Sequence, residues 1–362
     1  MAQSNCGSIP PEAFRRALLG WFRKHARALP WRKNHSPYPI WVSEVMLQQT
    51  QVATAIRFYP PFLRAFPSLK QLAQAPLERV LGLWSGLGYY RRARNLHAAA
   101  RLVSNKFGGR FPADYQRARS LPGVGDYTAR AVLSIAYQRP FAVVDGNVAR
   151  VVARLKAREG NINQPRFRLE IGHELQRLLS RRQPGNFNQA LMELGQTVCL
   201  PRAPRCTVCP IQKWCAAHHL KKPQDYPAPR TRRASELHYL AAAVIRRKSR
   251  VALIRGLDGG LLPDMWNFPA AFGRTRPAAL RHLRTKISGL AGRMVETVEI
   301  RPPVAEVRHT ITHRSIRVNL YPIAFQGNFY HESVKWFPVD RLGHTAVSQL
   351  ARKIFARLAS GV

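Results

Sequence analysis

The sequence has few acidic residues, few cysteines and no long apolar run. Its 362 residues contain 19 Asp and Glu against 58 Lys and Arg, which gives a formal net charge of +39. Five cysteines are too few for a secreted disulfide scaffold of this size. No stretch of about 18 apolar residues is present, so we expect no membrane-spanning helix. Residues 1–10 lack a signal-peptide pattern, and we expect an intracellular protein, cytoplasmic if the source is prokaryotic.

The positive charge is spread over both halves of the chain rather than gathered in one tail. A hydrophobic fraction of 46% excludes a disordered polycation. A field of this sign attracts polyanions, of which nucleic acid is the commonest; the alternative is a generally basic proteome. Residues 86–92 (Gly-Leu-Gly-Tyr-Tyr-Arg-Arg) place two aromatic rings beside two arginines. This mixture favours stacking on nucleic acid, with a solvated helix face as the alternative.

The pattern of the chain changes near residue 220, which indicates two domains. Residues 1–220 combine apolar positions at helical spacing with short Pro- or Gly-bearing connectors, so we expect many short helices and almost no sheet. Residues 221–237 are rich in proline and charge and are predicted to be a linker. Residues 238–362 predict an α+β domain. Its expected strands and helices are 240–245, 250–254, 316–323, 277–288 and 347–358.

Four cysteines are spaced to bind one metal centre. Cys199, Cys206, Cys209 and Cys215 lie within 17 residues, among several prolines. Four thiolates satisfy a tetrahedral zinc ion, and compact loops of this kind also hold 4Fe–4S clusters. The spacing alone leaves both open, although zinc sites usually contain two closely spaced pairs and only Cys206 and Cys209 form one.

A glycine-bearing turn is predicted to bind phosphate. Gly123, Val124 and Gly125 precede a helix that is expected to begin near Asp126. Such a turn presents backbone N–H groups, and the helix adds its positive end. The pattern is typical of a helix-hairpin-helix, and it gains weight from the charge of the chain; a simple helix connection is the alternative.

Two of the scarce carboxylates stand in unusual settings. Glu44 has apolar neighbours on nearly every side, from Ile40 to Leu47. A carboxyl group in an apolar pocket has a raised pKa and acts as a general acid, whereas an amphipathic surface helix is the alternative. Asp145 follows an apolar stretch and precedes Gly146, which predicts a helix N-cap. An ionised carboxylate beside a protonated one is the arrangement that cleaves glycosidic bonds.

Together these motifs resemble the MutY-type adenine DNA glycosylases, of the endonuclease III-like helix-hairpin-helix superfamily. The resemblance is carried by residues 29–32 and by four specific segments in the same order: 41–52, 121–125, 144–148 and 199–215. It implies a helical glycosylase domain whose cysteine loop holds a 4Fe–4S cluster. It also implies excision of adenine opposite 8-oxoguanine or guanine, and a monomer bound to double-stranded DNA.

Site residues follow from the resemblance, position by position. Glu44 matches the general acid that protonates adenine, and Asp145 the carboxylate that supports the oxocarbenium-like sugar. Tyr127 and Asn147 match the neighbours of these two groups.

Four further residues match positions that contact the DNA bases. Arg32 and Gln189 match the residues that hold the extruded adenine. Gln49 and Tyr89 match those that wedge into the duplex at the base that is not excised. Extrusion is required because the scissile bond is inaccessible within the base stack.

Position 127 separates this chain from bifunctional relatives. Those enzymes carry a Lys there as Schiff-base nucleophile, whereas Tyr127 forms no imine, so we expect glycosylase activity with little strand cleavage. One alternative function is that of a thymine-glycol-type glycosylase/lyase of the same superfamily, against which Tyr127 argues. The other is a non-catalytic nucleic-acid-binding protein with a structural metal, in which the Glu44 and Asp145 pair would be accidental.

The second half resembles the family's Nudix-like domain, which reads 8-oxoguanine. Residues 261–269 match its characteristic loop, but no acidic residue occurs between Asp264 and Glu296, so the carboxylates that bind Mg²⁺ in a working hydrolase are missing. We expect a recognition module. Thr312 and His313 match the lesion-sensing loop, where the family commonly has Phe-Ser-His and this chain has Ile-Thr-His.

Overall fold

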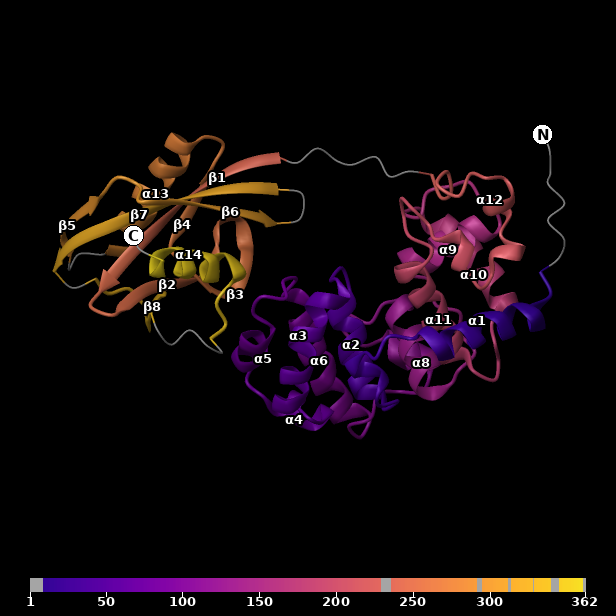
Figure 1. Cartoon of the computed structure of the whole chain (residues 1–362). Helices are drawn as coiled ribbons and strands as arrows, with labels where there is room; N and C mark the ends of the chain where they lie inside the picture. The colour runs from indigo at the N-terminus through magenta and orange to yellow at the C-terminus, as the bar shows by residue number, and fades with distance from the viewer. Residues whose placement is uncertain are drawn as a thin grey trace. The chain divides into compact units, whose positions relative to one another are not determined.

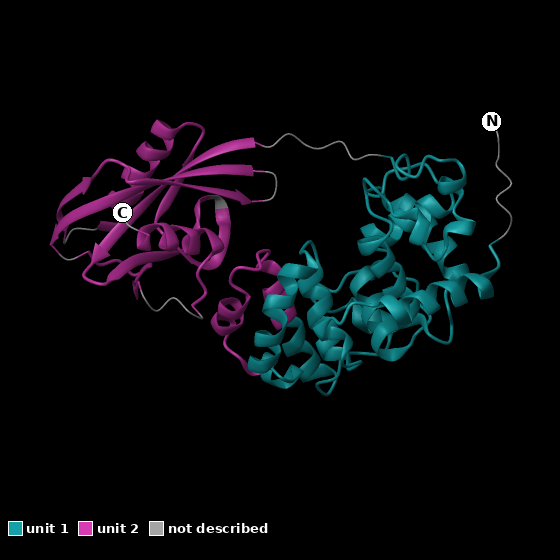
Figure 2. Cartoon of the chain, in the orientation of Figure 1, with its two compact units in different colours: residues 1–73, 98–231 teal, residues 74–97, 232–362 magenta. Residues whose placement is uncertain are grey.

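The computed structural model describes residues 9–228, 236–291, 295–311, 314–327, 329–339 and 345–360. The chain consists of two compact units (Figures 1 and 2). Unit 1 comprises residues 1–73 and 98–231, and unit 2 comprises residues 74–97 and 232–362. Each unit is described by itself below.

Unit 1 is helical, as the sequence predicts. Helices α4 and α6 cross its boundaries with unit 2. Its elements are α1 (Pro11–His25), η1 (Pro30–Arg32), α2 (Pro37–Leu47), α3 (Val52–Ala65), α4 (Leu69–Gln74), α6 (Arg91–Lys106), α7 (Tyr115–Arg119), α8 (Asp126–Tyr137), α9 (Gly146–Leu155), α10 (Pro165–Leu178), α11 (Pro184–Thr197), η2 (Cys206–Val208), η3 (Gln212–Trp214) and α12 (Ala216–His219).

One hydrophobic core contains residues from five helices: α1, α8, α9, α10 and α11. Helix α9 buries Val148, Val151, Val152 and Leu155, which recur at the i, i+3, i+4, i+7 spacing of a single helix face. Helix α11 approaches α8 closely at Gly185, where an added Cβ would lie 2.8 Å from the backbone of α8. These contacts set the relative positions of α8, α9 and α11, and these three helices carry much of the site.

Helix α2 is buried on all sides. Its only exposed or half-exposed positions lie near its ends, and residues 40 to 46 are all buried. Pro37 occupies its first turn, where no intrahelical N–H bond is lost. The helix packs against α8 and α3, so a polar side chain in its middle is surrounded by protein.

Unit 2 is an α+β body, which confirms the predicted class of the second half. Its elements are α5 (Leu77–Trp84), β1 (Glu236–Arg247), β2 (Arg250–Leu257), η4 (Asp258–Gly260), β3 (Leu261–Asn267), β4 (Ala270–Gly273), α13 (Arg276–Ala291), β5 (Val295–Ile300), β6 (Ala305–Ile311), β7 (Arg314–Gly327), β8 (Val334–Pro338) and α14 (Gln349–Ala359).

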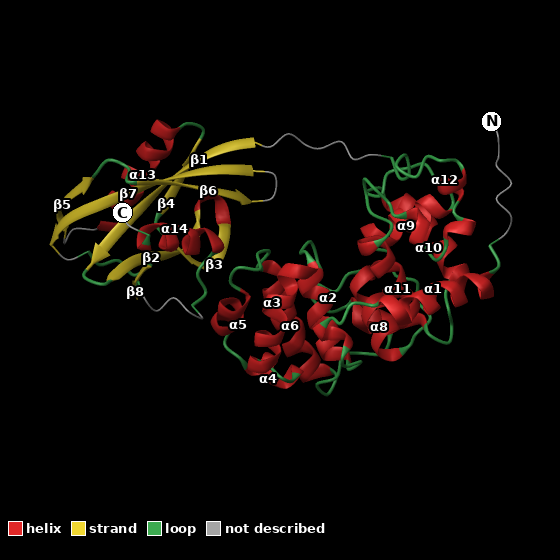
Figure 3. Cartoon of the chain, in the orientation of Figure 1, coloured by secondary structure: helices red, strands yellow, loops and turns green. Residues whose placement is uncertain are grey.

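The strands form one mixed sheet (Figure 3). Its main path runs β3-β2-β1-β7-β5, and β4, β6 and β8 pair with β1, β7 and β2. Strands β1 and β7 are parallel, while the other pairs are antiparallel. Ala241, Ala243 and Ile245 of β1 share a core with α13, and the intervening residues are buried on the opposite face. The central strand is therefore covered on both faces, as its continuous apolar run predicts.

The segment 74–97 belongs to unit 2 although it lies within the predicted first domain. Its side chains contact the rest of unit 2: Glu78 Oε1 accepts from Trp266 Nε1 at 3.0 Å, and Arg94 forms an ion pair with Asp264 at 2.5 Å. The predicted domains 1–220 and 238–362 remain a prediction, because the units are defined by contact and not by independent folding. Residues 229–235 of the predicted linker 221–237 lie outside the described residues.

Candidate active site and nucleic-acid interface

Glu44 lies in the middle of α2 and is almost completely enclosed. Its exposed fraction is 5%, and the neighbouring Trp41 and Met46 are fully buried. The surface-helix alternative for this residue is therefore wrong. A buried carboxyl group is stable when it is neutral or paired, and no cation bonds to Glu44 in the described part of the chain. The environment accordingly favours the protonated form.

One hydrogen bond and one nearby charge complete this environment. The Tyr127 hydroxyl, from the first turn of α8, donates to Glu44 Oε2 at 2.9 Å. Burial raises the pKa of Glu44 to about 7, with the Tyr127 hydrogen bond opposing the rise and the charge of Asp145 adding to it. Near neutral pH the carboxyl group is thus divided between its two protonation states, as a general acid requires.

Asp145 is the N-cap of α9, as predicted. Its Oδ1 accepts from the Val148 N–H at 2.6 Å, and its Oδ2 accepts from Asn147 Nδ2 at 2.9 Å. Both carboxylate oxygens thus accept hydrogen bonds at the N-terminus of α9, where the helix dipole is positive. Arg150 in turn bonds Asn147 Oδ1 at 3.0 Å. Gly195 permits this packing, because an added Cβ would lie 2.7 Å from the Asn147 Cβ.

Three predicted residues line one pocket in unit 1. Glu44 reaches it from α2, Arg32 from η1 and Gln189 from α11. Arg32 Nε donates to Gln189 Oε1 at 3.2 Å, so two residues 157 positions apart are joined at the pocket wall. Apolar side chains, including Trp31, form much of the remaining wall. An apolar pocket with a few convergent polar groups is the usual form of a small-ligand site.

The predicted hairpin connects α7 to α8. Gly123 has φ +75°, a conformation that favours glycine, and Gly125 is the N-cap of α8. Val124 is buried, and its N–H donates to the Leu121 carbonyl at 3.1 Å. The amides of Gly123 and Gly125 have no such backbone partner among the described residues, and both residues are exposed. They are therefore the two groups of this turn that are available to a phosphate.

The two predicted wedge residues share an uncommon backbone conformation. Gln49 in unit 1 has φ +54°, and Tyr89 in unit 2 has φ +50°. Both side chains are exposed, and the guanidinium of Arg92 lies 5.2 Å from the Tyr89 ring centre. Left-handed conformations at non-glycine residues cluster at functional sites. Thr312 and His313 lie outside the described residues.

The four predicted cysteine ligands line one cavity. Burial raises the pKa of Cys209 to about 12 and of Cys215 to about 11, so free thiols here are protonated. Arg154, with 2% of its surface exposed, places Nη1 3.3 Å from Cys199 Sγ, a buried positive charge suited to thiolates. Among the described residues no three His, Cys, Asp or Glu side chains converge closely enough to hold one metal ion.

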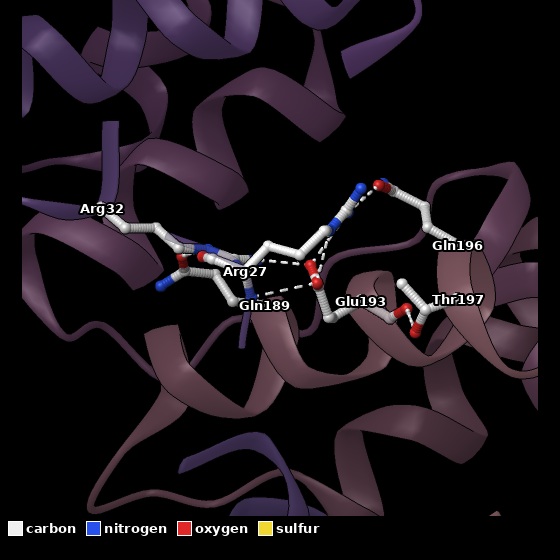
Figure 4. A network of polar contacts seen from close by, with 6 residues as sticks. All are labelled: Arg27, Arg32, Gln189, Glu193, Gln196 and Thr197. Carbon is white, nitrogen blue, oxygen red and sulfur yellow. Dashed lines mark hydrogen bonds and ion pairs between the residues drawn. The ribbon is translucent and has the colours of Figure 1, made fainter. Parts of the chain in front are cut away.

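Sequence reasoning missed Glu193. This α11 residue is 1% exposed and bonds both Arg27 and Arg32 (Figure 4). Glu193 has the same sequence signal that identified Glu44, namely apolar neighbours in the chain: Leu191, Met192 and Leu194.

Two family models match the chain. Residues 42–176 match the HhH-GPD superfamily of base excision DNA repair proteins, and residues 241–357 match the NUDIX domain. The structure of a thermostable thymine-DNA glycosylase is similar to 58% of this chain and 97% of its own, with a TM-score of 0.53 and 27% identity. An endonuclease III–DNA complex covers 59% of this chain and all of its own, with a TM-score of 0.50 and 22% identity, which bears on the fold alone.

These matches define the class as a helix-hairpin-helix base excision repair protein with an added NUDIX domain. An adenine DNA glycosylase of Rattus norvegicus is 33% identical over 95% of this chain and 77% of its own. One of Buchnera aphidicola is 28% identical over 96% of this chain and 98% of its own. The chain belongs to the adenine DNA glycosylase family.

The described part of the chain contains no helix with the length and apolar character needed to cross a membrane.

The raised pKa of Glu44 predicts a pH-dependent stability. The folded chain holds the Glu44 proton more tightly than the unfolded chain, in which the pKa is 4.5. The contribution of this proton to the free energy of unfolding is therefore fully present below pH 4.5 and is lost as the pH rises through about 7. Relative to Glu44→Gln, the free energy of unfolding should fall by about 3 kcal/mol over this range. Urea denaturation of both proteins from pH 4.5 to 8 measures the difference. A constant difference would contradict the assigned environment of Glu44.

Proposed function

We propose that this chain hydrolyses the N-glycosidic bond of adenine paired with 8-oxoguanine or guanine in duplex DNA, and leaves the strand uncut. The observation that carries the proposal is the buried Glu44 carboxyl, hydrogen-bonded to Tyr127 at 2.9 Å and close enough to Asp145 for that charge to raise its pKa. A neutral acid beside an ionised carboxylate is suited to cleaving a glycosidic bond.

The reaction balances with these residues. Glu44 gives its proton to a ring nitrogen of the extruded adenine, so the electron pair of the breaking C1′–N9 bond leaves with a neutral base. The ionised Asp145, held by the Val148 amide and by Asn147, stabilises the oxocarbenium-like sugar. Water then adds to C1′ and its proton passes to the Glu44 carboxylate, which restores the acid. The product is an abasic site.

Strand cleavage by a Schiff base needs an amine at the reacting centre. Tyr127 provides a phenol instead, and burial, together with Glu44 and Asp145, holds its pKa well above the usual range. The neutral hydroxyl hydrogen-bonds the acid and forms no imine with the sugar. The proposal is therefore a monofunctional glycosylase. Excess positive charge and the amides of Gly123 and Gly125 supply the contacts to phosphate.

We assign the C-terminal domain to recognition of 8-oxoguanine rather than to pyrophosphate hydrolysis. Helix α13 carries Arg281, Arg284 and Lys286 and no carboxylate. The two nearest preceding acids are paired with cations: Asp258 with Lys286, and Asp264 with Arg94. A Mg²⁺ site needs carboxylates that are free to bind the metal.

The cysteine cavity fits a 4Fe–4S cluster. Cys199, Cys206, Cys209 and Cys215 would hold it, and the buried Arg154 would offset its negative charge. Such a cluster supplies a rigid cross-link for the loop 199–215 and takes no part in the proton transfers above.

The central prediction concerns Glu44→Gln. Gln keeps the size and the bond to Tyr127 but carries no transferable proton, so adenine release should fall about 10²–10⁴-fold while duplex binding persists. Single-turnover assays on duplexes with A opposite 8-oxoguanine, followed by alkali, measure release. In the unaltered enzyme the rate should fall as the pH rises through about 7.

Glu170→Gln is the matched control, because Glu170 forms only exposed ion pairs with Arg158 and Arg166. Full activity of Glu44→Gln would refute the proposal. Strands left whole after alkali would favour a pure binder, and a high yield of borohydride-trapped adduct would favour a glycosylase/lyase.

The cluster proposal predicts a coloured protein. Anaerobically purified chain should show a visible absorption band and contain iron and acid-labile sulfide in equal amounts. Cys209→Ser should lose the band, whereas Cys6→Ser, outside the set, should keep it. A colourless protein that binds one zinc ion would contradict the assignment.

A further inference from the structure

A buried carboxylate in α11 connects two arginines that line the pocket of Glu44, Arg32 and Gln189. Glu193 Oε1 accepts from Arg27 Nε at 2.5 Å and from the Arg27 backbone N–H at 3.3 Å. Its Oε2 accepts from Arg27 Nη2 at 3.0 Å and from Arg32 Nη2 at 2.8 Å. Figure 4 shows this network together with Gln196 and Thr197. Both oxygens of the carboxylate thus accept from Arg27, which lies between α1 and η1, or from Arg32, the last residue of η1.

The network keeps Glu193 ionised although it is 1% exposed. Burial by itself would raise the pKa of Glu193, but the hydrogen bonds from Arg27 and the charge of Arg32 outweigh burial, and the pKa is lowered. Two cations share one anion, so a positive charge remains at the pocket wall.

Arg32 is held by three different partners. Its Nε donates to Gln189 Oε1 at 3.2 Å, its Nη1 to the Arg27 carbonyl at 3.0 Å and its Nη2 to Glu193. Its guanidinium also lies 5.1 Å from the centre of the Phe22 ring. Because the guanidinium is planar, these contacts set its orientation and leave two of its five N–H groups for a ligand.

The orientation of Gln189 follows from that of Arg32. Since its Oε1 accepts from Arg32, its amide NH₂ is free of this bond and is available as a donor. Arg32 and Gln189 both line the pocket that Glu44 reaches from α2, whereas Glu193 is absent from the lining. The wall formed by η1 and α11 thus presents donors to a ligand, and Glu193 acts on it only through Arg32.

We propose that Glu193 is a positioning residue for base excision. It fixes the guanidinium of Arg32, and through Arg32 the amide of Gln189, in the geometry that receives the acceptor nitrogens of an extruded purine before DNA arrives. This inference rests on the proposed function. A glutamine at position 193 could not replace the carboxylate, because one of its two terminal groups would be a donor facing a donor.

Glu193→Gln tests the proposal. The rate of adenine release at saturating enzyme should fall about 10–100-fold, as expected for a misplaced substrate-binding group, with unchanged affinity for the lesion duplex and an unchanged pH profile. Thr197→Val is the control: it removes the hydrogen bond to the Glu193 backbone carbonyl and leaves the carboxylate intact, so rate and affinity should both be unchanged. Thermal melting monitors folding of each variant.

A double-mutant cycle separates positioning from general stability. If Glu193 acts through Arg32, Glu193→Gln adds no further loss in an Arg32→Gln background. Three outcomes would each overturn the proposal. In the double variant, the two losses of rate could multiply. In Glu193→Gln alone, the rate could equal that of the unaltered enzyme, or the duplex affinity could fall in parallel with the rate. If Glu193→Gln does not fold, Glu193→Asp, which keeps the charge but withdraws the carboxylate by one methylene, is judged by the same criteria.

One readout is independent of activity. The Arg32 Nε–H resonance of ¹⁵N-labelled protein should exchange slowly with solvent in the unaltered chain and rapidly in Glu193→Gln. An unaltered chain that releases no adenine would refute the proposed function, whereas equal exchange in the two proteins would refute the positioning role of Glu193.

Discussion

The enclosure of a single carboxyl group in α2 is the constraint on which the site depends. Apolar residues surround Glu44 because the whole helix is buried between α3 and α8. A hydrogen bond to one of its carboxyl oxygens comes from the Tyr127 hydroxyl, at the start of the helix that follows the hairpin. The fold therefore joins the proposed phosphate-binding turn to the proposed proton donor through one helix, α8, and a hydrogen bond.

Two buried glutamates in unit 1 have opposite protonation behaviour for reasons visible in their surroundings. Glu44 has a phenol and an anion near it, which leaves burial as the dominant influence and raises its pKa. Glu193 has two guanidinium groups, which lower its pKa although its side chain is also buried. The first is suited to donating a proton and the second to holding cations in place. Environment, rather than residue type, assigns the two roles.

Local features were predictable from the sequence, and long-range convergence was not. The burial of Glu44 follows from its apolar neighbours, and the cap at Asp145 from the Gly that follows it. Glu193 carries the same apolar signal as Glu44, but nothing local indicates that Arg27 and Arg32, more than 150 residues away, would meet it. The grouping of residues 74–97 with the sheet likewise depends on contacts between distant segments.

The most direct test is a titration of the Glu44 side chain itself. Carbon-13 NMR of protein labelled at the glutamate carboxyl carbons, with Glu44→Gln used to assign the signal, reports its protonation without any substrate. The account predicts a midpoint at about 7, with the proton bound below that pH. A midpoint near 4.5, the value of an ordinary glutamate, would contradict it, because the carboxyl group would then be ionised when the base must be protonated.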